Sequence, residues 1–420
     1  MLKKGNALNH PPRLFVSTIM KPVLINPEAF RPQLPALTSI RFLAAAWVAV
    51  FHAQAMRIFF GPEWFQVIAS IGDMGVHFFF VLSGFIMVYT YSGRLESRRD
   101  FWQARFARIY PAFIFSLLLM APGFYYVSLK LDVAKIVPEW VWPAAHLKLT
   151  TVLALTLLQT WIPQNSMALH MPTWSLSNEA FFYFLFPFLL PLFGRFSRKQ
   201  LLAFVPACFV LGATASILYN WIQPDGPMAR NSHQIVPWLY FMKFHPLSRV
   251  AEFLLGMACG VVFLHSPRNR RTAWPWIAAG IAMVAVAGAF LHRIPELVLH
   301  ASVIAPAFAA IIYGVALRPA GLGVLETKWF VLLGEASYSF YLLHGLVIAL
   351  FTHYFQDASG ALRHQNALGL LLLLATTAAV SIGVYKLIER PMRRVLRPKP
   401  ATGKESAPAL APATNAEAPG

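Results

Sequence analysis

Arg41 and His52 are eleven residues apart in an apolar stretch that begins at Ile40. At about 100° per residue, eleven steps make just over three helical turns, so both side chains project from nearly the same face, about 16 Å apart. Alone, a basic residue at the end of a span is often a snorkelling anchor, and a histidine is often a core group. Their shared face predicts a polar track, with a fixed cation at one end and a proton-transfer group at the other.

A second polar group opens a later apolar stretch, where Ser175, Glu179 and Tyr183 stand at i, i+4 and i+8. This spacing predicts a polar stripe along one side of a helix. Helix capping is the competing interpretation, because Ser or Asn followed by Glu suits a helix start. Counted from the outer ends of their spans, Glu179 and His52 share a depth. We therefore predict that Glu179 orients His52 and raises the basicity of its imidazole.

Two further pairs combine charge with helical spacing. Arg105 and Arg108 are three residues apart and share one helix face, which suits phosphate binding, although basic residues at a cytoplasmic helix end need no ligand. Arg249 and Glu252 form an i, i+3 pair of opposite sign inside a span, and this pair can be structural or functional.

Several single polar residues are candidates for lining a substrate passage. Ser83 precedes a glycine, a pattern that also serves close helix packing, and the hydroxyl-rich segment from residue 337 to 344 indicates polar surroundings. The predicted lining residues are Ser83, Trp174, Ser175, Arg249, Glu252, Tyr338 and His344. The sequence has no zinc-ligand spacing and no glycine-rich nucleotide motif, so we expect no metal.

The composition indicates that the helices carrying these residues lie in a membrane. Of 420 residues, 57% are hydrophobic and 12% are charged, which is far from a soluble domain, and the mean hydropathy is +0.56. We predict an all-α bundle of about ten transmembrane helices. The predicted spans are about 37–58, 73–92, 108–127, 174–194, 201–221, 248–265, 273–291, 297–317, 328–351 and 368–388.

The basic residues indicate how this bundle is oriented. With a cytoplasmic N-terminus, 24 Lys and Arg fall on the cytoplasmic side of these spans and 8 on the other. This bias follows the positive-inside rule and accounts for the net charge of +18 without nucleic acid. Both termini are then cytoplasmic, with a lead-in at 1–36, a membrane domain at 37–396 and a disordered tail at 397–420.

Three other features complete the organisation. No signal peptide is visible in the polar lead-in. The apolar segment 147–161 is too short to cross the membrane and is interpreted as re-entrant or interfacial. Cys208 and Cys259 both lie in apolar spans and do not indicate a disulfide framework or a metal site.

Taken together, these stretches resemble the acyltransferase 3 family of polytopic membrane acyltransferases. The resemblance extends from Ser39 to about Arg394. Its motifs, in order, are Arg41 with His52, Phe79 to Phe85, Arg105 to Pro111, Trp174 to Glu179, Arg249 to Gly256, Ser337 to His344 and Ile388 to Pro391. His77 departs from the pattern, because family members often carry a carboxylate or another small polar residue there.

The resemblance implies ten helices with cytoplasmic ends, an acyl-CoA donor that is usually acetyl-CoA, and essential roles for Arg41 and His52. It also implies hydroxyl acceptors such as cell-surface carbohydrates. No extra domain is expected after the tenth span, which is typical of the stand-alone form.

These observations give one hypothesis for function. Arg41, Arg105 and Arg108 bind the phosphates of acyl-CoA at the cytoplasmic mouth, and His52 is the general base on an acceptor hydroxyl. The acceptor is an exported carbohydrate, which can be lipid-linked, and the protein lies in the cytoplasmic (inner) membrane. Transfer can be direct or through an acyl-enzyme. The alternatives are a carrier or flippase for a lipid-linked sugar or anionic solute, and transfer of succinyl or another acyl group to a different acceptor.

Overall fold

The computed structural model describes residues 31–56, 58, 61–226, 236–265, 270–290, 297, 304–318, 321–355 and 367–398, and these ranges contain helices and no strand. Nine of the described helical segments are long and apolar enough to cross a membrane, and one shorter apolar helix accompanies them. The predicted multi-pass helical bundle is confirmed. The lead-in up to residue 30, the tail from residue 399 and part of the eighth predicted span lie outside the described residues.

The helices have the following bounds. The first half contains α1 (Pro35–Ala55), α2 (Glu63–Ser70), α3 (Gly75–Tyr91), α4 (Arg98–Lys130), α5 (Val133–Ile136), α6 (Val141–Ala145), α7 (Leu147–Leu155), α8 (Trp174–Phe193) and α9 (Arg198–Ile222). The second half contains α10 (Pro237–Phe244), α11 (Pro246–His265), α12 (Ala273–Ala289), α14 (Ile304–Ala316), α15 (Lys328–Glu335), α16 (Ser337–Phe355), α17 (Ala367–Val384) and α18 (Arg390–Leu396).

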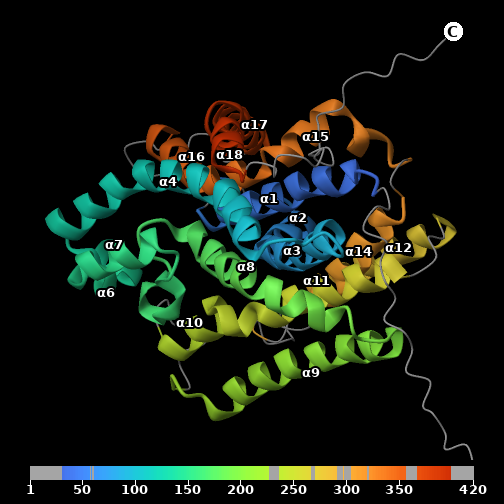
Figure 1. Ribbon diagram of the computed structural model, residues 1–420. Coiled ribbons are helices and arrows are strands. Elements are labelled where there is room, and N and C mark those ends of the chain that lie inside the picture. The colour runs from blue at the N-terminus through green and yellow to red at the C-terminus, as the bar shows by residue number, and fades with distance from the viewer. Residues whose placement is uncertain are drawn as a thin grey trace, which may run out of the picture.

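The centre of the bundle is formed by α1, α3 and α11 (Figure 1). Helix α1 packs against α3, α15 and α16, whereas α3 packs most extensively against α11. On one flank α4 contacts α16 and α18, on another α12 pairs with α14, and α9 covers the outside of α11. Helix α1, which carries Arg41 and His52, is therefore covered on several sides by other helices.

Many large apolar side chains are exposed on the outer helices, as expected for a surface that faces lipid. Exposed tryptophans gather near helix ends, where their amphipathic rings suit the membrane interface. They are Trp64, Trp221, Trp238, Trp274, Trp276 and Trp329.

The ninth predicted span is interrupted. The sequence predicts one helix over 328–351, but α15 ends at Glu335 and α16 begins at Ser337. Ala336 between them closes α15 through its backbone N–H, which bonds the Leu332 carbonyl. The single-helix prediction is therefore wrong at this point, because hydropathy records apolar length and not the direction of the chain.

Segment 147–161 turns back after a short helix. Helix α7 has only nine residues and is followed by three short 3-10 turns that lead directly into α8. Polar side chains in these turns are buried and bond the start of α8: the Gln159 amide donates to the Thr173 carbonyl at 2.8 Å, and the Thr160 and Ser177 hydroxyls are 2.6 Å apart. This path favours the re-entrant alternative, since the Gln159 and Thr160 side chains bond to groups inside the protein.

Helices α3 and α11 approach each other through glycine. A Cβ atom on Gly256 would lie 2.0 Å from the Val81 carbonyl oxygen, and one on Gly84 would lie 2.2 Å from the Phe253 carbonyl oxygen. No side chain fits at either distance. Gly84 therefore serves the close-packing alternative.

We expect Gly256→Ala to destabilise the protein by about 1–3 kcal/mol, because the added methyl group must push α3 and α11 apart. Unfolding of the purified protein in detergent, followed by tryptophan fluorescence, measures this loss. Gly383→Ala is the matched control, because a Cβ there meets nothing within 4 Å. Equal unfolding midpoints for the two variants would contradict the packing argument.

Candidate active site

A cavity of about 50 Å³ lies between α1, α3, α4, α8 and α16. This volume has room for roughly three to five water molecules. Its lining residues are Arg41, Val76, Phe79, Phe80, Arg108, Ile109, Ser175, Leu176, Glu179, Ser337, Tyr338 and Tyr341. Five of the residues predicted from the sequence as functional arrive here from helices distant in the chain, namely Arg41, Arg108, Ser175, Glu179 and Tyr338.

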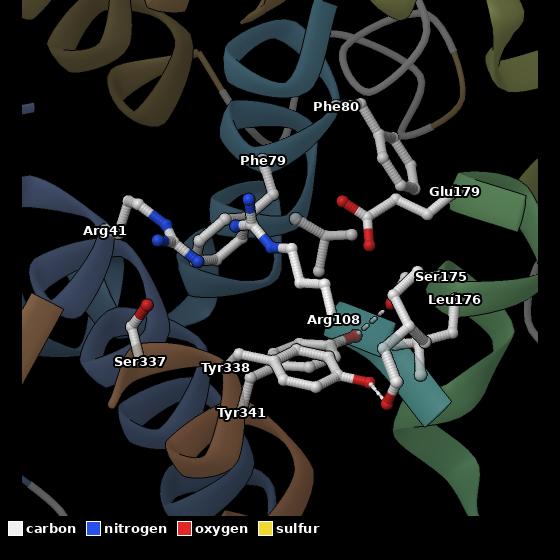
Figure 2. A pocket seen from close by; sticks show the side chains of 12 residues that line it. Arg41, Phe79, Phe80, Arg108, Ser175, Leu176, Glu179, Ser337, Tyr338 and Tyr341 are labelled. Atoms are coloured by element: carbon white, nitrogen blue, oxygen red, sulfur yellow. Dashed lines mark hydrogen bonds between the residues drawn. The ribbon is translucent and has the colours of Figure 1, made fainter. Parts of the chain in front are cut away.

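Arg41 and Arg108 bring two cations to the same cavity. Their guanidinium groups point toward each other from α1 and α4, with Glu179 of α8 on the opposite wall (Figure 2). The two cations and the Glu179 carboxylate are within electrostatic range of one another. Within the described part of the chain, however, neither arginine forms an ion pair within 4 Å. The cavity therefore presents two guanidinium groups that no carboxylate holds by direct contact.

Glu179 is held by its own helix. The Tyr183 hydroxyl donates to a Glu179 carboxylate oxygen at 3.0 Å, and Ser83 of α3 lies within hydrogen-bonding reach of Tyr183. The predicted i, i+4 spacing thus brings these side chains together on one side of α8. Trp174, at the start of α8, packs edge-on against Phe80 and supports the wall without lining the cavity.

The first turns of α16 supply the other polar wall. The Tyr341 hydroxyl accepts from Ser175 at 2.9 Å, and the Tyr338 hydroxyl donates to the Ile109 carbonyl at 2.9 Å (Figure 2). The Tyr341 hydroxyl also donates to the Pro172 carbonyl at 3.0 Å. These bonds join α16 to α4 and to the chain that enters α8. Hydroxyl groups that are tied to backbone carbonyls in this way keep fixed positions on the cavity wall.

His52 lies beside another histidine. Its Nδ1 is 2.9 Å from the Val48 carbonyl oxygen and 3.3 Å from Nε2 of His344, and Nδ1 of His344 faces the Tyr341 carbonyl oxygen. A carbonyl oxygen only accepts, so each Nδ1 carries a proton in the neutral pair. Nε2 of His344 then accepts from His52, and Nε2 of His52 keeps its lone pair, which is the form that a general base needs.

The predicted contact between Glu179 and His52 is not found. Both residues are described, yet Glu179 bonds Tyr183 and His52 bonds Val48 and His344. The depth estimate assumed that α8 begins at the membrane surface. The residues before it, Pro172 and Thr173, are buried, so the first turn of α8 already lies inside the bundle.

Arg105 lies one turn before Arg108 and does not line the cavity. Its guanidinium donates to the Tyr91 hydroxyl at 2.8 Å and lies over the rings of Tyr91, Phe101 and Tyr183. We predicted that Arg41, Arg105 and Arg108 act together. The structure places Arg41 and Arg108 in the cavity and Arg105 outside it.

Arg249 and Glu252 do not line the cavity. They form a buried ion pair of 3.2 Å, and the second carboxylate oxygen of Glu252 is 2.9 Å from Nδ1 of His77. The Arg249 Nε donates to the Lys243 carbonyl at 2.7 Å. This network joins α3 to α11, which favours the structural alternative for the pair and gives His77 a partner.

Three polar residues at or near the cavity are not among those predicted from the sequence. Ser337 and Tyr341 line it, and Tyr341 is three residues from Tyr338. Glu389 is buried in a π-helical turn between α17 and α18, accepts from Ser339 at 2.9 Å, and is within electrostatic range of both cavity arginines. A carboxylate directly after the last predicted span, in the stretch from Ile388 to Pro391, was the available signal, because such residues are rarely exposed to lipid.

The fold and the cavity define a multi-pass membrane protein with a polar site enclosed by its helices. A family model described as an acyltransferase domain matches residues 34–386. The chain therefore belongs to the acyltransferase 3 family and is an enzyme that transfers acyl groups, which confirms the resemblance.

Named relatives agree with this assignment. The chain is 29% identical over 382 residues to the acyltransferase MdmB of Streptomyces mycarofaciens, covering 87% of this chain and 92% of MdmB. It is 24% identical over 388 residues to the O-acetyltransferase OatA of Staphylococcus aureus, covering 86% of this chain and 57% of OatA. The chain thus spans little more than half of OatA. No solved structure matches it.

We expect Glu252→Ala to destabilise the protein by roughly 3–5 kcal/mol, because it leaves the buried Arg249 without its carboxylate. Asp132→Ala is the control: it removes the exposed partner of Lys135 and should cost about 1 kcal/mol or less. Denaturant unfolding of both variants in detergent measures the difference. If Glu252→Ala unfolds with the wild-type midpoint, the buried network does not stabilise the α3–α11 contact.

Proposed function

We propose that this enzyme transfers an acyl group, acetyl in the first instance, from acyl-CoA on the cytoplasmic side of the cytoplasmic membrane to a hydroxyl of an exported carbohydrate. The name of OatA, an O-acetyltransferase, supports an acetyl group and an oxygen acceptor. The excess of basic residues expected on the cytoplasmic side includes Arg41 and Arg108, which suits an anionic donor from that side.

One observation carries this proposal: two arginines share an enclosed cavity without an ion pair among the described residues. Buried cations are expensive unless an anion compensates them, and guanidinium groups match phosphate oxygens bidentately. The diphosphate of CoA provides such an anion. With Arg41 at the diphosphate, the pantetheine arm runs along α1 toward His52, over the helical distance of about 16 Å.

The reaction then needs only one base. The acceptor hydroxyl oxygen attacks the thioester carbonyl while its proton moves to Nε2 of His52. The tetrahedral intermediate collapses, the carbon–sulfur bond breaks, and the leaving thiolate takes the proton from the imidazolium to become CoA. His344 accepts from Nδ1 of His52 and keeps that imidazole in the required tautomer and orientation. Glu179 stays with the arginines, where its charge balances theirs.

We expect His52→Ala to reduce acetyl transfer by at least about 10²-fold, since general-base catalysis contributes about 10²–10⁴-fold. The measurement is acetyl-CoA-dependent labelling of carbohydrate in membranes that contain the protein, together with mass spectrometry of surface polysaccharide from intact cells. His353→Ala is the control, because His353 is exposed near the end of α16 and has no part in the site. Undiminished labelling by the His52 variant would exclude it as the base.

The positioning role of His344 can be tested by comparing two substitutions, one that can accept a hydrogen bond from His52 and one that cannot. We expect His344→Leu to lower kcat by about 10-fold or more with little change in KM for acetyl-CoA, because it removes the acceptor for His52. His344→Gln should restore part of the rate, because an amide oxygen can accept the same bond. A purely structural role predicts equal losses for both variants, and that result would reject His344 as a positioning residue.

A further inference from the structure

Helix α18 lies against the first turns of α4, beyond the part of the chain that the family model matches. The Gln103 side chain of α4 donates to the Leu396 carbonyl at 3.0 Å and fixes this contact. Glu389, within electrostatic range of the cavity arginines, directly precedes α18. The helix is therefore tied to α4 at its C-terminal end, and the residue before it lies near the cavity arginines.

Several arginines lie near Arg397, where α18 contacts α4. Arg397, just after α18, is within electrostatic range of Arg393, Arg105 and Arg108. The pKa of the Arg397 guanidinium is lowered from its ordinary value, first because the surrounding chain covers part of it and then because Arg393 and Arg105 lie close. Like charges gathered in this way repel each other, so packing and not mutual attraction holds them together.

No carboxylate neutralises this group of cations by contact. Over the described ranges, Arg105, Arg393 and Arg397 take part in no ion pair, and Nε of Arg105 is buried without a hydrogen-bond partner. A snorkelling arginine extends its head to water, whereas the Arg105 head is held inward by Tyr91. The arrangement thus provides the donors that an anion site needs.

We propose that Arg105, Arg393 and Arg397 form a binding site for a phosphate monoester, the 3′-phosphate of the acyl-CoA nucleotide. This inference rests on the proposed function, which assigns the diphosphate to the deeper pair Arg41 and Arg108. A phosphate monoester carries nearly two negative charges and three acceptor oxygens, which suits several guanidinium forks. The 3′-phosphate projects from the nucleotide end of the donor, and Arg397 is within electrostatic range of Arg108 of the deeper pair.

The test measures binding and requires no acceptor. Wild-type protein in nanodiscs of neutral phosphatidylcholine is titrated calorimetrically with CoA and with 3′-dephospho-CoA. We expect CoA to bind at least about tenfold more tightly, which corresponds to about 1.4 kcal/mol. The double variant Arg393→Gln/Arg397→Gln should lose this preference and bind both ligands as the wild type binds dephospho-CoA.

Arg394→Gln is the matched control. It removes the same charge from α18, but Arg394 is not among the charges that act on Arg397, so the preference for CoA should remain. Equal binding of CoA and dephospho-CoA by the wild type would overturn the 3′-phosphate site and leave the donor proposal standing. A double variant weakened equally for both ligands would show that α18 acts only structurally.

Two further outcomes separate the remaining explanations. If neither CoA nor dephospho-CoA binds to the wild type, the proposed donor is wrong, and the 3′-phosphate site fails with it. If nanodiscs containing phosphatidylglycerol abolish the preference in the wild type, and the double variant no longer retains that lipid, then the arginines bind a lipid headgroup phosphate. That result would overturn the nucleotide assignment.

Discussion

A charged guanidinium inside an apolar bundle must be compensated, and most of the site follows from how Arg41 and Arg108 meet this requirement. Two carboxylates, Glu179 and Glu389, lie within electrostatic range of both arginines, yet neither forms a contact ion pair with them. Each carboxylate bonds a hydroxyl, that of Tyr183 in the case of Glu179. The two carboxylates stabilise the guanidinium groups electrostatically from a distance, so the N–H donors of the arginines stay available to a ligand. Ion pairs in direct contact would have occupied those donors.

The same requirement explains where the helices are irregular. Non-helical backbone is tolerated at membrane depth only where it is buried in protein or lines a cavity. The re-entrant turns after α7 bring Pro172 and its carbonyl to Tyr341. The break at Ala336 starts a new helix at Ser337, which lines the cavity. The π-helical turn ends at Glu389, and such turns often occur at functional sites. All three irregularities adjoin the polar site.

Hydropathy and helical spacing predicted much of this arrangement. The apolar spans and the stripe of Glu179 and Tyr183 follow from local periodicity, which the bundle leaves unchanged. The charge count placed Arg41 and Arg108 on one side of the bundle, and both line the cavity. The partner of His52 could not be predicted in this way. Depth in the membrane depends on where a helix starts, and α8 starts below the surface because a buried re-entrant segment precedes it. The position of Glu389 is visible in the sequence, but its contact with Ser339, 50 positions away, is not.

Helix α16 connects the two ends of the track that α1 defines. Tyr338, Tyr341 and His344 stand at i, i+3 and i+6, so they follow one face and rise about 9 Å from the cavity to His52. The middle residue, Tyr341, is bonded to the Pro172 carbonyl, and its own carbonyl faces Nδ1 of His344. One tyrosine therefore ties the re-entrant segment to the histidine pair. The position of that segment and the orientation of His52 are coupled through α16, so the wall that encloses the cavity also sets the geometry of the base.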